Sequence, residues 1–368
     1  MKTVAILGTR GYPSFYGGFE TAVRKLAPFL ADQGWDVTVY GRPNADDHEG
    51  SADARINQVI TKGINSQAFS TLTYGLTSAL HAAFNKPDVV LVMNVANGFW
   101  LPLLKMRGIK TLVNVDGMEW ERAKWGKLAK KVFLLGARLT ARFADEIIVD
   151  AEAIGVRWAE EFKRQGIFIP YGGDIPEIQK LEPGLTHRGY ILLVARFVPE
   201  NSIREFFESV PALAKKWPVV IVGSSGFAGE LDILAADLDA RYENVRWLGH
   251  LNDDLRLFSL WQNAGAYFHG HSVGGTNPAL VQAMACGAPT VARDTVYNRE
   301  VLEEAGVFVT ASVPEIVSGI SALMQDGARQ GSLSAAAILR ATESYSWISV
   351  CSKYQAALET MRAHVLSA

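Results

Sequence analysis

The first forty residues constrain the fold most, because they run through strand, glycine-rich loop, helix and strand in that order. Residues 4–7 form a short apolar run, and residues 8–18 are rich in glycine. Residues 19–33 have the apolar period of a helix that Gly34 ends, and residues 36–40 have the pattern of the next strand. A strand, a crossover helix and a second strand form a βαβ unit with parallel strands. The sequence therefore predicts an α/β protein with a parallel sheet.

The same alternation continues and then starts again in the second half of the chain. Further strands are expected at residues 89–93, 111–114 and 146–149, and then at residues 190–195, 219–222, 245–248, 266–269 and 290–292. A single hydrophobic core stops growing at roughly 250–300 residues, and this chain has 368. The sequence thus predicts an N-terminal domain of residues 1–170, a polar linker of residues 171–188, a C-terminal domain of residues 189–345, and a last helix in residues 346–368 that packs back on the N-terminal domain.

Composition argues against several broad classes of protein. The chain is 49% hydrophobic and 20% charged, whereas disordered chains have fewer apolar residues and more net charge. A net charge of −2 argues against nucleic acid as a partner, because proteins that bind the phosphate backbone are usually basic. The chain has two cysteines, no signal-peptide pattern and no apolar run of about 18 residues. We therefore expect a cytoplasmic protein whose membrane contact is peripheral, on the inner face of the cell membrane.

The glycine-rich loop of residues 8–20 is the first stretch whose residues suggest a ligand-binding role. Counted from Gly8, the second and third glycines of a G-x-G-x-x-G fingerprint would fall on Arg10 and Pro13, which argues against a nicotinamide oxidoreductase. The loop still brings a helix N-terminus to the edge of the sheet where anions are held. Its length exceeds the usual two to six residues. We therefore expect Gly17 and Gly18 to contact a ligand, the alternative being plain glycines at a helix start.

The second such stretch is the turn between a predicted strand and a helix at residues 267–278. Asn277 is expected as the N-cap of that helix, with a proline directly after it. Gly274 and Gly275 let a ligand approach bare backbone, and the helix dipole favours negative charge, so a diphosphate suits the turn. His271 is expected to donate to a phosphate or a sugar hydroxyl, the alternative being a hydrogen-bonded loop histidine. His269 has the same two interpretations, with the structural one favoured.

These two stretches and two others together resemble a known family. The others are N-V-D-G-M-E-W at residues 114–120 and A-R-F-V-P-E-N at residues 195–201. The chain resembles, over nearly its whole length, the retaining family-4 glycosyltransferases of GT-B fold, and above all their bacterial branch of rhamnosyltransferases in capsule and cell-wall polysaccharide synthesis. The resemblance implies two Rossmann-like, doubly wound parallel-sheet domains facing a central cleft. The N-terminal domain would bind the acceptor and the C-terminal domain the nucleotide sugar.

The resemblance also implies roles for individual residues. Arg196 would neutralise the donor diphosphate with its guanidinium fork, the alternative being a surface salt bridge. The implied donor-binding set is Gly17, Gly18, Arg196, Asn201, Gly223, His271, Gly274, Gly275, Thr276, Asn277 and Gln282. Retaining transfer without an evident nucleophile implies front-face attack with the diphosphate as base, and the implied catalytic set is Asp116, Arg196 and His271. No metal and no cofactor besides the donor co-substrate are expected, because no Asp-x-Asp follows a predicted strand.

Four positions depart from the broader family pattern. Asn201 replaces a lysine, and Gly274 and Gln282 replace the two glutamates of an E-x7-E motif. Asp116 stands where many relatives have an acceptor-side histidine. Gly274 belongs to the rhamnosyltransferase branch, whereas Gln282 departs from the branch as well. A neutral amide accepts hydrogen bonds from ribose hydroxyls more weakly than a carboxylate does. The alternative function is therefore a GT-B-shaped binding or partner subunit with lost or altered turnover.

Asp116 and Glu119 are the candidate carboxylates on the acceptor side. Both follow the predicted strand at residues 111–114, at the end where ligands lie. A carboxylate there could orient the acceptor hydroxyl or accept its proton. The alternative is turn and helix-cap chemistry, since Asp before Gly is common in turns. Tyr16 completes the expected acceptor-binding set.

Residues 120–142 alternate basic and apolar side chains in a helical pattern. A basic amphipathic helix of this kind lies on anionic lipid, the alternative being a solvated face over a core stripe. The basic residues are Arg122, Lys124, Lys127, Lys130, Lys131, Arg138 and Arg142. The resemblance implies transfer of a sugar, L-rhamnose from dTDP-rhamnose as the first candidate, to a saccharide acceptor, and a lipid-linked acceptor would make such a membrane contact useful.

Overall fold

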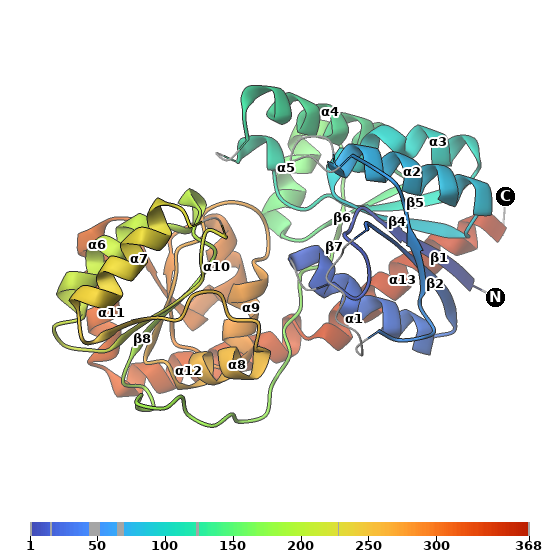
Figure 1. Cartoon of the computed structure of the whole chain (residues 1–368). Coiled ribbons are helices and arrows are strands. Elements are labelled where there is room, and N and C mark those ends of the chain that lie inside the picture. The colour runs from blue at the N-terminus through green and yellow to red at the C-terminus, as the bar shows by residue number, and fades with distance from the viewer. Residues whose placement is uncertain are drawn as a thin grey trace. The chain divides into compact units, whose positions relative to one another are not determined.

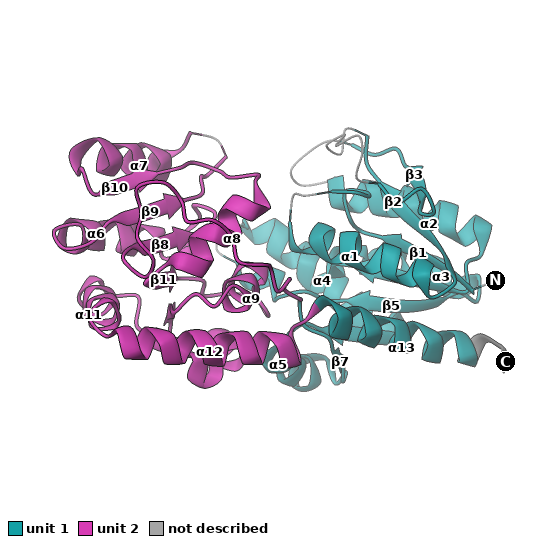
Figure 2. Ribbon diagram, turned by 90° about the horizontal axis from the view of Figure 1, so that it is seen from below, with its two compact units in different colours: residues 1–171, 347–368 teal, residues 172–346 magenta. Residues whose placement is uncertain are grey.

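The computed structural model describes residues 2–14, 17–43, 52–64, 70–122, 125–226 and 228–366. The chain divides into two compact units, which Figure 2 colours separately. Unit 1 comprises Met1–Tyr171 and Trp347–Ala368, and unit 2 comprises Gly172–Ser346. Residues 172–188 of the expected linker thus belong to unit 2, and the last helix belongs to unit 1.

Unit 1 is built on a seven-stranded parallel sheet. Its strands are β1 (Lys2–Leu7), β2 (Trp35–Gly41), β3 (Asn57–Ile60), β4 (Val89–Met93), β5 (Lys110–Asn114), β6 (Glu146–Val149) and β7 (Ile167–Phe168). They lie in the order β3-β2-β1-β4-β5-β6-β7, and every pair is parallel. The strand order reverses between β1 and β4, the place where open α/β sheets bind ligands at their carboxyl edge.

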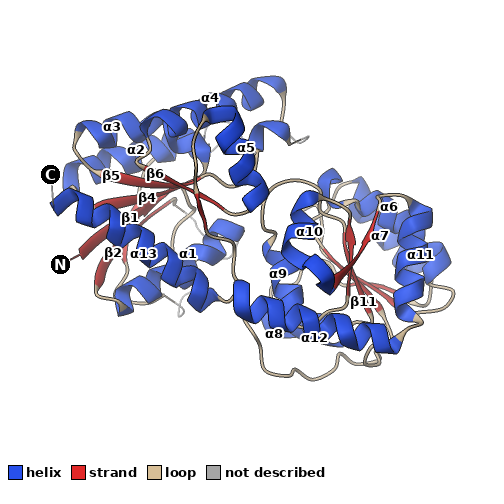
Figure 3. Cartoon of the chain, turned by 180° about the vertical axis from the view of Figure 1, so that it is seen from behind, coloured by secondary structure: helices blue, strands red, loops and turns tan. Residues whose placement is uncertain are grey.

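Helices cover both faces of this sheet (Figures 1 and 3). They are α1 (Gly18–Asp32), α2 (Ser70–Asn85), α3 (Leu101–Met106), α4 (Lys127–Phe143), α5 (Glu152–Phe162) and α13 (Trp347–Leu366), with the 3-10 helices η1 (Val95–Trp100) and η2 (Glu119–Glu121). Helices α1 and α13 share one face, and α2, α3 and α4 lie together on the other (Figure 1). A strand buried on both faces needs a continuous apolar run, which explains sequences such as VVLVM in β4.

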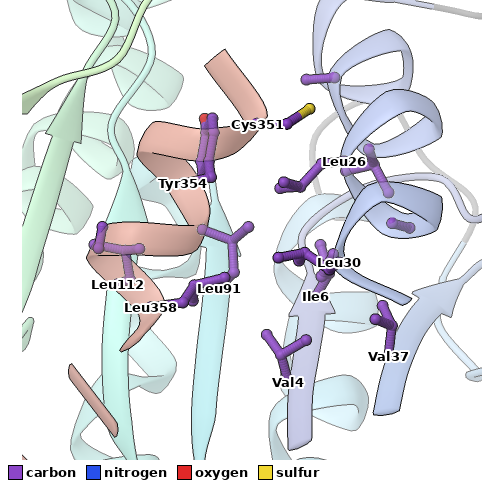
Figure 4. Close-up of a cluster of buried hydrophobic side chains, with 14 of the residues drawn as sticks. Val4, Ile6, Leu26, Leu30, Val37, Leu91, Leu112, Cys351, Tyr354 and Leu358 are labelled. Atoms are coloured by element: carbon purple, nitrogen blue, oxygen red, sulfur yellow. The ribbon is translucent and has the colours of Figure 1, made fainter. Parts of the chain in front are cut away.

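The core between α1, α13 and the sheet contains side chains from both ends of the chain. Leu26 of α1 and Leu358 of α13 belong to one cluster, and in Figure 4 Leu358 lies beside Leu91 of β4 and Leu112 of β5. Tyr354 of α13 also reaches the end of β5, where its hydroxyl accepts a 2.7 Å hydrogen bond from Asn114 Nδ2. The last helix is therefore part of the core of unit 1.

Unit 2 repeats the architecture with a six-stranded parallel sheet in the order β10-β9-β8-β11-β12-β13. Its strands are β8 (Ile191–Val194), β9 (Val219–Val222), β10 (Val245–Trp247), β11 (Ala266–His269), β12 (Thr290–Arg293) and β13 (Gly306–Val309). Its helices are α6 (Ile203–Leu213), α7 (Glu230–Arg241), α8 (Asp254–Asn263), α9 (Pro278–Ala285), α10 (Val296–Leu302), α11 (Val313–Met324) and α12 (Gly327–Ser344), with η3 (Pro199–Asn201) and η4 (Glu303–Ala305). Strand order reverses between β8 and β11.

The two faces of this second sheet form separate apolar clusters. One contains residues of α8, α9 and α12, and the other residues of α6, α7 and α11. Both sheets are thus doubly wound, and the predicted fold class is confirmed. Among the described residues, no helix combines the length and the apolar character that crossing a bilayer requires.

Candidate functional site

In each unit, most of the predicted residues lie at the carboxyl edge of the sheet, next to the strand-order reversal. In unit 1 they follow β1 and β5, and in unit 2 they follow β8, β9 and β11. The edge of unit 1 is described first.

The loop after β1 leads into α1 without a side-chain cap. Gly17 is the N-cap of α1, in extended conformation, and Gly18 is the first helical residue. A Cβ at Gly17 would lie 3.0 Å from Oε2 of Glu20, whose Oε1 accepts a 3.3 Å hydrogen bond from the Arg10 N–H. Both glycines therefore present backbone at the helix start, where the dipole favours an anion. Tyr16 lies outside the described residues.

Asp116 stands in a strained turn after β5. Its φ is +57°, in the left-handed region, and its N–H donates to Asn114 Oδ1 at 2.9 Å. Asn114 is in turn fixed by its bond to Tyr354. A left-handed aspartate costs free energy and is frequent at functional sites. Burial raises the pKa of the Tyr171 hydroxyl well above its usual range, and the charge of Asp116 adds to the shift.

Glu119 is buried and engaged within its own segment. Its Oε2 accepts a 2.7 Å hydrogen bond from Trp125 Nε1, and its Oε1 lies 2.6 Å from Arg122 Nε in an ion pair. Only 4% of its surface is exposed. This arrangement favours the structural interpretation of Glu119 over an acceptor contact.

In unit 2, the turn after β11 ends in a capped helix. Asn277 is the N-cap of α9, its Oδ1 accepts from the Ala279 N–H at 2.9 Å, and Pro278 begins the helix, so the predicted cap is confirmed. Gly274 has a φ of +89°, which favours glycine. Gly274, Gly275 and Thr276 are buried within the turn.

A segment after β8, residues 196–202, is tied to this turn; we name it the strap. Asn201 Nδ2 donates to the Arg196 carbonyl at 2.8 Å, and Asn201 Oδ1 lies 2.6 Å from His271 Nδ1. Ser272 donates to the Glu200 carbonyl through its N–H at 3.0 Å and its hydroxyl at 2.9 Å. Strap and turn are therefore one hydrogen-bonded structure.

This bonding assigns the proton on His271. Because the Asn201 amide nitrogen donates to Arg196, the amide oxygen faces the ring and His271 Nδ1 carries hydrogen. In the neutral ring Nε2 is then an acceptor, and it becomes a donor when the ring is an imidazolium. His271 can thus neutralise a phosphate only in its charged form.

Arg196 and Gly223 follow the neighbouring strands β8 and β9. Arg196 is exposed. Gly223 has a φ of +134°, and a Cβ there would lie 1.8 Å from the Ala195 carbonyl oxygen. The packing of the two loops therefore requires glycine at 223, independently of any ligand.

Gln282 uses both ends of its amide inside unit 2. Its Oε1 accepts from the Asp174 N–H at 3.0 Å, and its Nε2 donates to the Asp174 carbonyl at 2.8 Å. The Gln282 side chain on α9 thus holds the backbone at Asp174 in place. This arrangement favours a structural role for Gln282 over a hydroxyl contact.

Two buried residues beside the turn were given little or no weight from the sequence. His269 is 4% exposed, its Nδ1 lies 3.0 Å from the Tyr267 hydroxyl, and its Nε2 has no hydrogen-bond partner. Burial, with a smaller contribution from His271, holds the pKa of His269 well below its usual range. Glu200 is 7% exposed and lies in η3, and no pattern in the sequence around it indicated a buried carboxylate.

Helix α4 carries the predicted basic surface. Leu128 and Leu135 are 76% and 47% exposed, while Gly136 and Thr140 are buried against η1. The exposed basic side chains on α4 are Lys127, Lys131, Arg138 and Arg142. Lys124 lies outside the described residues. Among the residues that the structure describes, no group of three His, Cys, Asp or Glu side chains could hold a metal ion.

Comparison with protein families matches the two halves of the chain separately. Residues 1–174 match a domain of unknown function, DUF1972, and residues 188–326 match the glycosyl transferases group 1. The O-antigen chain mannosyltransferase B of Escherichia coli is 23% identical over 179 residues, which are 47% of this chain and 46% of that protein. The match thus spans about half the length of this curated relative.

Solved glycosyltransferase structures share the whole architecture. Sucrose-phosphate synthase from Thermosynechococcus elongatus superposes with a TM-score of 0.84 at 17% identity, covering 99% of this chain and 100% of that one. HepE of Anabaena in complex with UDP gives 0.74 at 15% identity, covering 98% and 100%. A TarM mutant of S. aureus in complex with UDP gives 0.74 at 11% identity, covering 97% and 100%. The fold is therefore GT-B, and the match to the group 1 glycosyl transferases lies within residues 188–326.

Proposed function

We propose that this protein is a retaining, metal-independent glycosyltransferase of family-4 type. It takes a sugar from a nucleotide diphosphate donor, with L-rhamnose from dTDP-rhamnose as the first candidate, and transfers it to a lipid-linked saccharide in surface polysaccharide synthesis. The observation that carries the proposal is the turn of residues 270–277. It joins a capped helix start to the strap, inside the part of the chain that matches group 1 glycosyl transferases. The UDP complexes of HepE and TarM support a nucleotide donor, and the mannosyltransferase relative supports a polysaccharide product.

On the donor side, unit 2 supplies positive potential for the leaving diphosphate. The N-terminus of α9 and the exposed guanidinium of Arg196 lie on the turn and the strap, and His271 adds positive charge when its ring is protonated. Charge that develops on the diphosphate in the transition state is stabilised by such fixed dipoles and cations. These groups provide the charge for which other glycosyltransferases use a cation, so we propose that transfer proceeds without one.

On the acceptor side, unit 1 would hold the attacking hydroxyl near Asp116. Asn114, itself bonded to Tyr354, accepts the N–H of Asp116, so the backbone that carries the carboxylate is fixed before the acceptor binds. In a front-face reaction the hydroxyl loses its proton to the departing diphosphate, and Asp116 orients that hydroxyl.

A transfer assay with the purified chain tests the proposal. We expect a lipid-linked saccharide to gain mass with dTDP-rhamnose, or with one of a panel of UDP- and GDP-sugars. The product should keep the donor's anomeric configuration by NMR, and the rate should be unchanged in EDTA. Arg196→Ala should lower kcat/KM about 10²-fold, the usual effect of removing one group that stabilises transition-state charge. Arg204→Ala, an exposed arginine on α6, is the control. Consumption of no donor with any acceptor would refute the enzyme.

A second candidate function, a binding subunit with lost turnover, is favoured by Gln282 and Asn201. Gln282→Glu separates the two. If the chain lost its activity together with the family's glutamate, the carboxylate of Gln282→Glu should strongly raise the transfer rate. If the chain is an active enzyme, the variant should keep or lose activity, because a glutamate cannot donate to the Asp174 carbonyl.

We further propose that α4 docks on anionic membrane. Each basic side chain near a negatively charged bilayer contributes about 1 kcal/mol, and Leu128 and Leu135 are exposed among them. Lys127→Glu with Lys131→Glu should abolish flotation with phosphatidylglycerol vesicles. Lys215→Glu with Lys216→Glu, on exposed residues of unit 2, should leave it intact. Equal flotation of both double variants, or equal binding to neutral vesicles, would contradict docking through α4.

A further inference from the structure

The strap contains a buried carboxylate that the protein itself leaves unsatisfied. Glu200 lies in η3 and is 7% exposed, and neither of its carboxylate oxygens has a hydrogen-bond partner among the described residues. A carboxylate taken out of water without a partner costs several kcal/mol. Such a group needs an explanation.

The backbone at Glu200 is held rigidly beside the turn. Its carbonyl accepts both the N–H and the hydroxyl of Ser272, and the next residue, Asn201, is bonded to His271. On the other side of the strap, the hydroxyl of Ser202 donates to the Gly270 carbonyl at 2.9 Å. The strap therefore keeps Glu200 next to the donor turn while using none of its carboxylate.

Gln282, the residue on α9 for which a ribose contact was considered, has its amide occupied by protein groups. Gln282 donates to and accepts from the backbone of Asp174. The Gln282 amide is thus occupied by bonds within the protein, whereas both carboxylate oxygens of Glu200 remain available to accept hydrogen bonds from a ligand. Glu200 is therefore a better candidate than Gln282 to accept hydrogen bonds from ligand hydroxyls at this edge.

The chemistry of a carboxylate limits the class of ligand that Glu200 could bind. It accepts hydrogen bonds and repels phosphate, so its partner is not the diphosphate itself. Its two oxygens match two adjacent hydroxyls, each of which donates one hydrogen bond. We propose that Glu200 binds a vicinal diol of the donor, on either the ribose or the transferred sugar. The inference rests on the proposed function and adds a specificity-determining residue to the donor site.

Calorimetric titration of Glu200→Gln with four probes tests the inference. The probes are UDP, 2′-deoxy-UDP, dTDP and dTDP-rhamnose. If the diol is that of ribose, the variant should bind UDP about tenfold more weakly and the two deoxyribose diphosphates unchanged. If the diol is on the sugar, the loss should occur with dTDP-rhamnose and not with dTDP. The size follows from losing one charged hydrogen-bond acceptor.

A second measurement separates a ligand-binding role from a structural one. Without ligand, Glu200→Gln should unfold at a higher temperature than the wild type, because a neutral amide costs less to bury than an unpaired charge. Glu208→Gln, on an exposed carboxylate of α6, should change neither affinity nor unfolding temperature. A lower unfolding temperature for Glu200→Gln, unchanged affinity for all probes, or equal weakening of all probes would overturn the inference. If the wild type binds no probe, the proposed function fails first, and the inference falls with it.

Discussion

His269 and His271 lie two residues apart on β11 and its continuation, with ring centroids separated by 6.1 Å. His271 is only half-buried and its proton is assigned by Asn201, whereas His269 is enclosed against Tyr267. Sequence analysis left the same two interpretations for both residues, because the local pattern carries no information on burial. Only the packing around β11 separates the half-buried His271, which is proposed to meet a ligand, from His269, which is enclosed in the core.

The buried His269 should make stability depend on pH. Its pKa in the folded chain lies well below the value near 6.5 of an unfolded histidine. Above about pH 6.5 both states are neutral and the stability is fully present. As the pH falls below about 6.5, the unfolded state binds the proton first, so the free energy of unfolding decreases by up to about 1.4 kcal/mol per pH unit.

Denaturant unfolding between pH 8 and pH 5 measures this slope. His269→Gln should flatten it. His187→Gln, on an exposed histidine of the same unit, should keep the wild-type slope. An unchanged slope in His269→Gln would show that this ring is not the group responsible.

Gly223 should prove necessary for the fold of unit 2. A Cβ there meets the Ala195 carbonyl at 1.8 Å, and the φ of +134° is strained for any other residue. Gly223→Ala should lower the free energy of unfolding by roughly 2 kcal/mol or more. Gly331→Ala in α12, where a Cβ meets nothing within 4 Å, should be neutral or stabilising by up to about 1 kcal/mol. Similar effects of the two substitutions in thermal unfolding would contradict this account.

At the scale of elements, the start of α9 combines a helix cap with the proposed diphosphate-binding site. Substitutions of Asn277 can separate the two roles. Asn277→Ala removes the bond to the Ala279 N–H and should cost about 1 kcal/mol of stability. Asn277→Asp keeps a capping oxygen and adds a negative charge where the diphosphate is proposed to bind. It should therefore keep the unfolding temperature and weaken nucleotide binding. Asn277→Ser, which also caps, should retain both properties, and a loss of both in Asn277→Asp would argue against the separation.

The sequence pattern predicted helices and strands correctly where a short stretch of residues is enough to define the element. Strands β4 and β9 are unbroken apolar runs, and the N-cap of α9 is an Asn-Pro pair. Strand β3 was not predicted, because it is an edge strand whose residues are largely exposed. Its pairing with β2, rather than its own composition, makes it a strand.

For the whole molecule, the two compact units predict two separable unfolding transitions. Leu358→Ala creates a cavity in the core of unit 1 and should lower the stability of that unit by about 2–5 kcal/mol. A nucleotide at 100 times its dissociation constant should add about 2.7 kcal/mol to unit 2. Calorimetry of the full chain should show each change in a different transition. A single transition that moves with both changes would contradict independent units.

The sequence alone determined the α/β class, the glycine turn before α9 and the helix cap, because spacing and residue type along a short segment fix local hydrogen bonds. It also identified Asp116 and His271 as candidates through their place after strands, and the family resemblance added Arg196 and Gln282. Tertiary structure alone decided which of these side chains are already occupied. Gln282 meets the backbone 108 residues away, and Asn114 meets Tyr354 across 240 residues. It also buried Glu200 without a partner. Such contacts depend on which distant segments the packing brings together, so no local pattern encodes them.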